Sequence, residues 1–277
     1  MKVWMNGHLV DDADAKVSVL DVGFLYGDGL FETLRVDGGL PIQWQEHLAR
    51  FIWSAYQLEI DLRGQKEVLK AALLQTIEAN NLKECALRLT VTRGMSAGWI
   101  PGEAEGPPTL VVTARTPIAP PVEWRAITVP SPFRLGAELP RHKTLNYLPN
   151  LLAQRAAVAA GADEALLVCE GRVLEGAMSN FFAVVDGALR TAPVADGVLP
   201  GIVRASVLDL ARAGAVRVEE RAVLEDELPR ASECFCTNSL IGVQPVTRIG
   251  GGKVGSGEIG ELTRGLRLGY ERIAQSG

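Results

Sequence analysis

Residues 141–147 read RHKTLNY, and residues 171–180 read GRVLEGAMSN. The first stretch places the amine of Lys143 in a short segment just ahead of a predicted helix. The second stretch places the carboxylate of Glu175 among small residues, which leave space for a flat ring. Taken singly, Lys143 suits a solvated surface position and Glu175 suits a turn. The other motifs in the sequence decide whether Lys143 and Glu175 have a functional role.

Residues 199–204 read LPGIVR and predict the start of another helix. The first N–H groups of a helix lack intrahelical partners and point along the axis, where they favour an anion such as phosphate. A lysine amine can form a Schiff base with an aldehyde, and a carboxylate can keep a pyridine nitrogen protonated. Lys143, Glu175 and this helix start are the parts that hold pyridoxal 5'-phosphate. The sequence therefore predicts this cofactor, with Lys143 as the catalytic residue.

Composition narrows the classes of function. The chain has 277 residues, 47% of them hydrophobic, and a net charge of −5. This balance argues against a nucleic-acid partner, and no apolar run reaches membrane-spanning length. The first residues lack the apolar core of a signal peptide, so we expect a cytoplasmic enzyme with reduced thiols. The four cysteines and three histidines are dispersed, which predicts no metal site.

The alternation of helical and strand-like periods predicts an α/β (mixed α+β) chain with two domains. We expect a small N-terminal α/β domain over residues 1–114, an interdomain linker over 115–122 and a larger C-terminal domain over 123–277. Three prolines mark the linker. The predicted strands include residues 29–36, 86–92, 109–114, 164–168, 180–185 and 234–237. The predicted helices include residues 44–58, 66–80, 151–160, 201–213 and 261–274.

Three further segments could line a cofactor site. Arg50 lies on a predicted helix and could pair with a phosphate, although most helix arginines are solvated. Residues 237–240 read TNSL and either complete a phosphate cup or form a turn. Residues 21–29 are rich in glycine and aromatic residues, which is typical of a shaped loop near a pocket.

Together these segments resemble the class IV aminotransferases, the fold-type IV enzymes that use pyridoxal phosphate. That family includes branched-chain and D-amino acid aminotransferases and 4-amino-4-deoxychorismate lyases. The resemblance covers almost the whole chain. It implies two domains, the smaller one N-terminal, and a homodimer whose active site lies near the interface. Its substrates would be an amino donor and a 2-oxo acid acceptor.

The resemblance also implies roles for individual residues. Lys143 forms the Schiff base and moves the proton, and Glu175 pairs with the pyridine nitrogen. The family usually has threonine where this chain has Val203, which offers only its backbone N–H, so we expect a weaker phosphate cup or a compensating contact from Ser239. The expected cofactor contacts are Arg50, Lys143, Tyr147, Glu175, Asn180, Ile202, Val203 and Ser239. The expected substrate-pocket residues are Tyr26, Phe31 and Arg93.

The reaction itself is less constrained by the sequence. The residues at 31–32 and 146–147 favour an aminotransferase, which is the first interpretation. The chain length and residues 237–240 favour the alternative, a 4-amino-4-deoxychorismate lyase that releases pyruvate and 4-aminobenzoate. Residues 95–99 lack the basic pair of D-amino acid enzymes, although Arg134 or Arg141 could substitute for it. A non-catalytic cofactor-binding protein is a third alternative, which the intact Lys143 and Glu175 disfavour.

Overall fold

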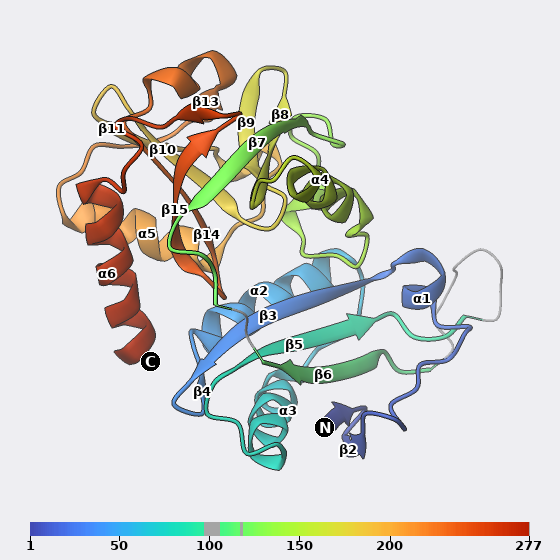
Figure 1. Cartoon of the computed structure of the whole chain (residues 1–277). Coiled ribbons are helices and arrows are strands. Elements are labelled where there is room, and N and C mark those ends of the chain that lie inside the picture. The colour runs from blue at the N-terminus through green and yellow to red at the C-terminus, as the bar shows by residue number, and fades with distance from the viewer. Residues whose placement is uncertain (97–105, 117–118, 277) are drawn as a thin grey trace. The chain divides into compact units, whose positions relative to one another are not determined.

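The computed structural model describes residues 1–96, 106–116 and 119–276 (Figure 1). The chain forms two compact units. The first comprises Met1–Ile118 and His142–Asn146, and the second comprises Ala119–Arg141 and Tyr147–Ser276. The division falls within the predicted linker, of which residues 117 and 118 lie outside the described residues. The short segment that carries Lys143 thus belongs to the first unit, although it follows the linker in sequence.

The first unit is an antiparallel sheet with three helices. Its strand order is β2-β1-β6-β5-β3-β4. The tight turn between the first two strands holds Asn6 and Gly7 at positive φ, as the Asn-Gly pair predicts. The strands are β1 (Lys2–Met5), β2 (His8–Asp11), β3 (Gly29–Asp37), β4 (Leu40–Pro41), β5 (Cys85–Thr92) and β6 (Thr109–Arg115). The helices are α1 (Val22–Tyr26), α2 (Trp44–Gln57) and α3 (Lys66–Ala79).

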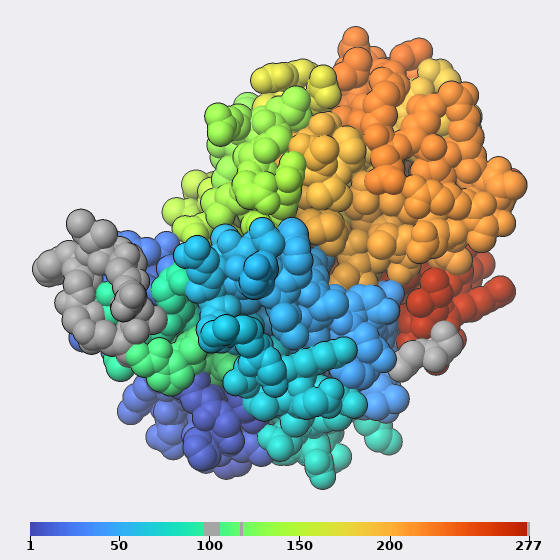
Figure 2. Space-filling model, turned by 180° about the vertical axis from the view of Figure 1, so that it is seen from behind, coloured from blue at the N-terminus to red at the C-terminus, as the bar shows by residue number. Residues whose placement is uncertain are grey.

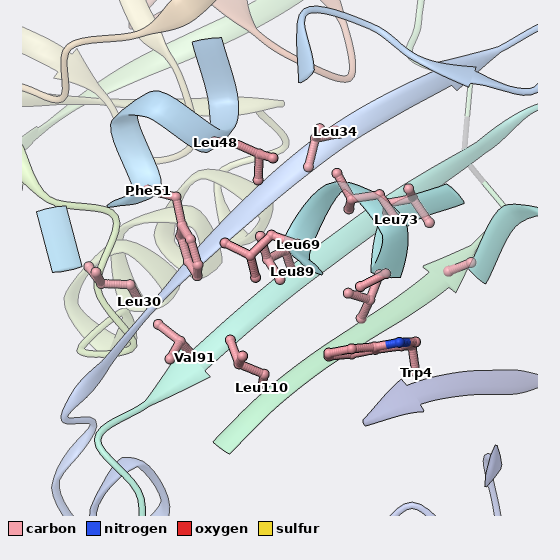
Figure 3. Close-up of a cluster of buried hydrophobic side chains, with 14 of the residues drawn as sticks. Trp4, Leu30, Leu34, Leu48, Phe51, Leu69, Leu73, Leu89, Val91 and Leu110 are labelled. Carbon is pink, nitrogen blue, oxygen red and sulfur yellow. The ribbon is translucent and has the colours of Figure 1, made fainter. Parts of the chain in front are cut away.

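The core of this unit lies between one face of the sheet and helices α2 and α3. Alternate residues of β3, such as Leu30 and Leu34, pack with Leu48 and Phe51 of α2 (Figure 3). Viewed from behind, light-blue and cyan residues of these helices form part of the surface of the unit (Figure 2). Because side chains alternate along a strand, Phe31 of β3 points to the opposite face of the sheet.

The second unit contains the larger sheet, in the order β12-β11-β10-β14-β15-β7-β8-β9-β13 with β16 paired to β15. The strands are β7 (Trp124–Pro130), β8 (Glu164–Cys169), β9 (Arg172–Gly176), β10 (Asn180–Val185), β11 (Ala188–Thr191), β12 (Val218–Glu220), β13 (Val223–Leu224), β14 (Glu233–Asn238), β15 (Gly242–Ile249) and β16 (Gly252–Lys253). The helices are α4 (Leu148–Ala159), α5 (Ile202–Ala213) and α6 (Glu261–Ser276).

An additional pairing between β9 and β10 closes six of these strands into a ring. The pairing brings Glu175 opposite Asn180. Helix α4 connects the parallel strands β7 and β8, as a crossover helix does. The ring strands share a core that includes Leu166, Phe181 and Cys236.

The predicted fold class, a mixed α/β chain, is confirmed. The predicted helices and strands agree with the structure to within a few residues. Helix α1 and strands β2, β4, β9, β11, β12, β13, β15 and β16 were not predicted. Of the helices described, none has the length and apolar character needed to cross a membrane.

Candidate functional site

The backbone around Lys143 is fixed as an extra strand-like segment on β3. Strand β4 pairs only with the far end of β3, at Val36 and Asp37. The near end pairs instead with the Lys143 segment: the Phe31 N–H donates to the Lys143 carbonyl at 2.8 Å, and the Leu145 N–H donates to the Gly29 carbonyl at 2.9 Å. These bonds fix the position of Lys143 without involving its side chain.

The Lys143 amine lies over an aromatic ring that a second cation also contacts. Its Nζ is 4.5 Å from the centroid of the Phe31 ring, and the Arg88 guanidinium carbon is 3.7 Å from the same centroid. Both distances suit cation–π contacts. Arg88 reaches Phe31 because it lies on β5 opposite Thr33, which makes it a diagonal neighbour of Phe31 on the same face. Arg88 was not among the predicted site residues.

Arg50 belongs to a buried cluster on the other face of β3. Its Nε and Nη2 donate to the two carboxylate oxygens of Glu32, each at 2.7 Å, and His47 Nδ1 lies 2.8 Å from Glu32 Oε2. Burial opposes ionisation of Glu32, but the charges and hydrogen bonds of Arg50 and His47 hold its pKa well below the usual range. Burial lowers the pKa of His47 against the pull of Glu32, with Arg50 and Lys143 adding to the effect. We therefore assign an ionised Glu32 and a neutral His47.

The other two predicted pocket residues lie near helix α1. Tyr26 ends that helix and is partly exposed. Arg93 donates to Asp28 at 2.7 Å, to the Leu58 carbonyl at 2.7 Å and to the Glu59 carbonyl at 2.8 Å. These contacts tie the end of α2 to the loop before β3. Residues 95–99, which lack the basic pair of D-amino acid enzymes, lie partly outside the described residues, from residue 97 onward.

Glu175 is held firmly in the second unit. It lies on β9 and is 8% exposed. Its Oε2 accepts the Leu199 N–H at 3.1 Å and the Asn180 side-chain amide at 3.3 Å, and Asn180 also donates to the Leu199 carbonyl at 2.9 Å. Glu175 and Asn180, which were predicted separately as cofactor contacts, therefore meet, and both side chains bind the backbone just ahead of α5.

Tyr147 immediately precedes helix α4 and lies close to the same strand pair. Its hydroxyl donates to the Ala177 carbonyl at 3.2 Å. Ala177 is in the short loop between Glu175 and Asn180, which brings three predicted cofactor residues to one loop of the second unit.

The start of α5 fits a phosphate. Gly201 is the N-cap residue and has no side chain with which to cap the first turn. A Cβ atom at this position would clash with the Asn180 side-chain oxygen, so the backbone must approach Asn180 closely. The first-turn residues are Ile202 and Val203, whose side chains are buried. Since Val203 packs its side chain inward, we expect it to contribute only its N–H.

Ser239 directly follows strand β14. The preceding Asn238 accepts the N–H groups of Leu240 at 2.9 Å and Ile241 at 3.1 Å, which makes a tight turn at Ser239. The donors and acceptors of the second unit match the ring nitrogen and phosphate of pyridoxal phosphate. The first unit, taken by itself, provides an amine at Lys143 and a cation at Arg50.

Comparison with known proteins finds a matching family and similar relatives. The family model described as amino-transferase class IV matches residues 29–249. A D-alanine aminotransferase of Bacillus licheniformis is 36% identical over 96% of this chain and 95% of its own length.

Solved structures show the same similarity. The T.th. branched-chain amino acid aminotransferase, complexed with N-(5'-phosphopyridoxyl)-L-glutamate, superposes with a TM-score of 0.90 at 31% identity and covers 100% of this chain and 95% of its own. A Legionella pneumophila protein assigned as a 4-amino-4-deoxychorismate lyase has a TM-score of 0.88 at 28% identity and covers 95% of this chain and 97% of its own.

Proposed function

The chain belongs to the class IV aminotransferase family, and on that premise we propose that it uses pyridoxal 5'-phosphate to move an amino group from an amino acid to a 2-oxo acid. The position of Glu175 carries the proposal. Its carboxylate is fixed by Leu199 and Asn180 just ahead of the start of α5. An anchor for a ring nitrogen and a cradle for a phosphate thus lie in one unit and are linked through Leu199.

When bound, pyridoxal phosphate supplies an aldehyde for the amine and a protonated ring that withdraws electrons. Lys143 would hold the cofactor covalently, and its amine would take and return the proton at the substrate α-carbon as general base and acid. Glu175 would accept a hydrogen bond from the ring nitrogen and keep it protonated. The N–H groups of Ile202 and Val203 would bind the phosphate, with Ser239 and Arg50 as further contacts. Tyr147 and Asn180 would orient the ring, and Tyr26, Phe31 and Arg93 would line the substrate pocket.

A screen of amino donors, read by the absorption of the cofactor, tests the proposed reaction. We expect the purified protein with cofactor to be yellow, and its absorption band to shift when an amino donor converts the cofactor to its amine form. D-alanine, L-leucine and L-glutamate should be tested separately, because the relatives include enzymes for D- and L-amino acids. Adding a 2-oxo acid should restore the original band. Release of pyruvate from 4-amino-4-deoxychorismate without a 2-oxo acid would instead establish the lyase, and no band shift with any donor would contradict the aminotransferase.

Arg88 is the group that we propose for binding the substrate carboxylate. Its guanidinium and the Lys143 amine contact the same Phe31 ring, which places a fixed positive charge near the proposed reacting amine. Charge-assisted hydrogen bonds contribute about 1.5–3 kcal/mol each.

Replacement of Arg88 by alanine should therefore raise the KM for the amino donor by about 10-fold or more. Steady-state kinetics with a saturating acceptor would measure this effect. Arg35→Ala is the matched control, since Arg35 lies on the same face of the neighbouring strand β3 and pairs with Asp37 at 3.2 Å. An unchanged KM in the Arg88 variant would exclude this assignment.

We also propose a homodimer. Exposed apolar side chains gather in two places, one around α1 and one on α4. Phe24 and Val19 are 70% and 69% exposed, and Val158 and Leu148 are 65% and 58% exposed. Such patches mark interaction surfaces, and a second copy of the chain would cover them.

The four unpaired cysteines suit the reducing cytoplasm, where we place the enzyme.

A further inference from the structure

The loop at residues 176–179 joins Glu175 of β9 to Asn180 of β10. It closes on itself through a hydrogen bond from the Gly176 N–H to the Ser179 carbonyl at 2.7 Å. The two side chains that are proposed to hold the cofactor ring thus depend on four connecting residues.

Neighbouring elements hold the outward carbonyls of this loop. The Ala177 carbonyl accepts Asn150 Nδ2 at 2.8 Å in addition to the Tyr147 hydroxyl. The Met178 carbonyl accepts Asn238 Nδ2 at 3.1 Å. The loop is therefore bonded both to the start of α4 and to the turn that carries Ser239.

A buried carboxyl group, Glu164 of β8, fills the inside of the loop. Glu164 is 1% exposed. Its Oε2 accepts the Ser179 hydroxyl at 2.7 Å, and its Oε1 accepts the Ala165 N–H at 3.0 Å. A Cβ atom added to Gly176 would lie 2.9 Å from Glu164 Oε2 and would clash with the Ser179 hydroxyl. The space inside the loop therefore fits Glu164 closely.

We propose that Glu164 is a positioning residue for the cofactor ring, fixing the loop at residues 176–179 so that Glu175, Asn180 and Tyr147 keep their places. The inference rests on the proposed function. Burying a carboxyl group is unfavourable unless hydrogen bonds compensate for the lost hydration. An apolar side chain could fill the same space without that cost, but it could not form those hydrogen bonds. The hydrogen bond to Ser179, next to Asn180, is what an apolar residue could not supply.

The ionisation of Glu164 guides the choice of variant. Burial raises the pKa of Glu164 to about 7, against the hydrogen bonds from Ser179 and nearby backbone amides. Its neutral form is therefore compatible with the fold, and Glu164→Gln, which resembles that form, should still fold. The same reasoning makes Ser179→Ala a second variant, which removes the hydroxyl and leaves Glu164 in place.

The test compares Glu164→Gln, Glu164→Ala and Ser179→Ala in the cofactor-loaded protein. We expect Glu164→Ala to weaken cofactor retention, measured by absorbance titration, by about 10- to 100-fold. Replacing residues that orient the ligands of a metal ion has effects of this size. Its absorption band should move, and kcat should fall more than the KM changes. Glu164→Gln should recover most of the loss, and Ser179→Ala should show a smaller effect in the same direction.

Glu170→Gln is the matched control, because Glu170 is exposed at the opposite end of β8 and should change nothing. The proposal would be overturned if all three variants bound the cofactor within about 2-fold of the wild-type affinity and showed an unshifted absorption band. If Glu164→Ala does not fold, Ser179→Ala decides the matter: weaker cofactor retention supports the proposal, and an unchanged affinity and band overturn it. A wild-type protein that binds no cofactor would refute the proposed function instead, independently of Glu164.

Discussion

Replacing Lys143 with alanine should lower kcat for transamination by at least about 10³-fold, since a positioned acid–base group alone contributes about 10²- to 10⁴-fold. The variant also loses the amine that holds the cofactor covalently. Borohydride reduction followed by mass spectrometry should attach the cofactor to the wild-type chain and leave the Lys143→Ala chain unmodified. The absorption band of the variant should be that of the unlinked aldehyde.

The structure predicts that this variant folds normally. The hydrogen bonds that fix the segment use the backbone of Lys143 and Leu145, not their side chains. Lys70→Ala is a matched control, because the Lys70 amine lies 4.8 Å from the Trp44 ring centroid in a similar cation–π contact. Any lost cation–π stabilisation is shared by both variants, so only Lys143→Ala should lose activity. A Lys143→Ala enzyme with wild-type turnover would refute the central proposal.

The local signals in the sequence were sufficient for most of the longer helices and strands. Helices α2 and α3 follow from apolar residues at helical spacing, and β3 and β5 follow from alternation. Strand β15 was missed because Pro245 lies within it, and proline normally argues against an interior strand. The structure accommodates Pro245 opposite Phe235, and the pairing with β7 shifts register after Val246.

Some residues of the candidate site could be predicted from the sequence, and others could not. Lys143 and Glu175 could be selected from short motifs, because the residues next to each of them in the sequence indicate its proposed role. Arg88 and Glu164 could not. Arg88 meets Phe31 only through the register of β3 and β5, and Glu164 meets Ser179 only through the pairing of β8, β9 and β10. Such registers are set by packing between segments far apart in sequence, which no local pattern specifies.

Glu175→Gln should lower kcat by about 10²- to 10³-fold, the range found when one preorganised electrostatic contact is removed. A neutral amide cannot favour the protonated pyridine nitrogen as a carboxylate does, so the ring withdraws electrons less strongly. Glutamine can still accept the Leu199 N–H through its oxygen, which preserves the local fold. The single-turnover rate with a saturating donor should therefore fall while cofactor binding persists.

Glu227→Gln provides the comparison that separates chemistry from stability. Glu227 has the same 8% exposure as Glu175 and likewise accepts a backbone N–H, from Leu224 at 2.9 Å, but it also pairs with Arg190 at 3.1 Å. Losing that pair should reduce the free energy of unfolding by about 1–3 kcal/mol and leave kcat unchanged. Glu175→Gln should show the reverse, a large loss of rate with a small change in stability. If the two variants lost rate in proportion to their loss of stability, Glu175 would be a structural residue and the proposed ring-nitrogen contact would be wrong.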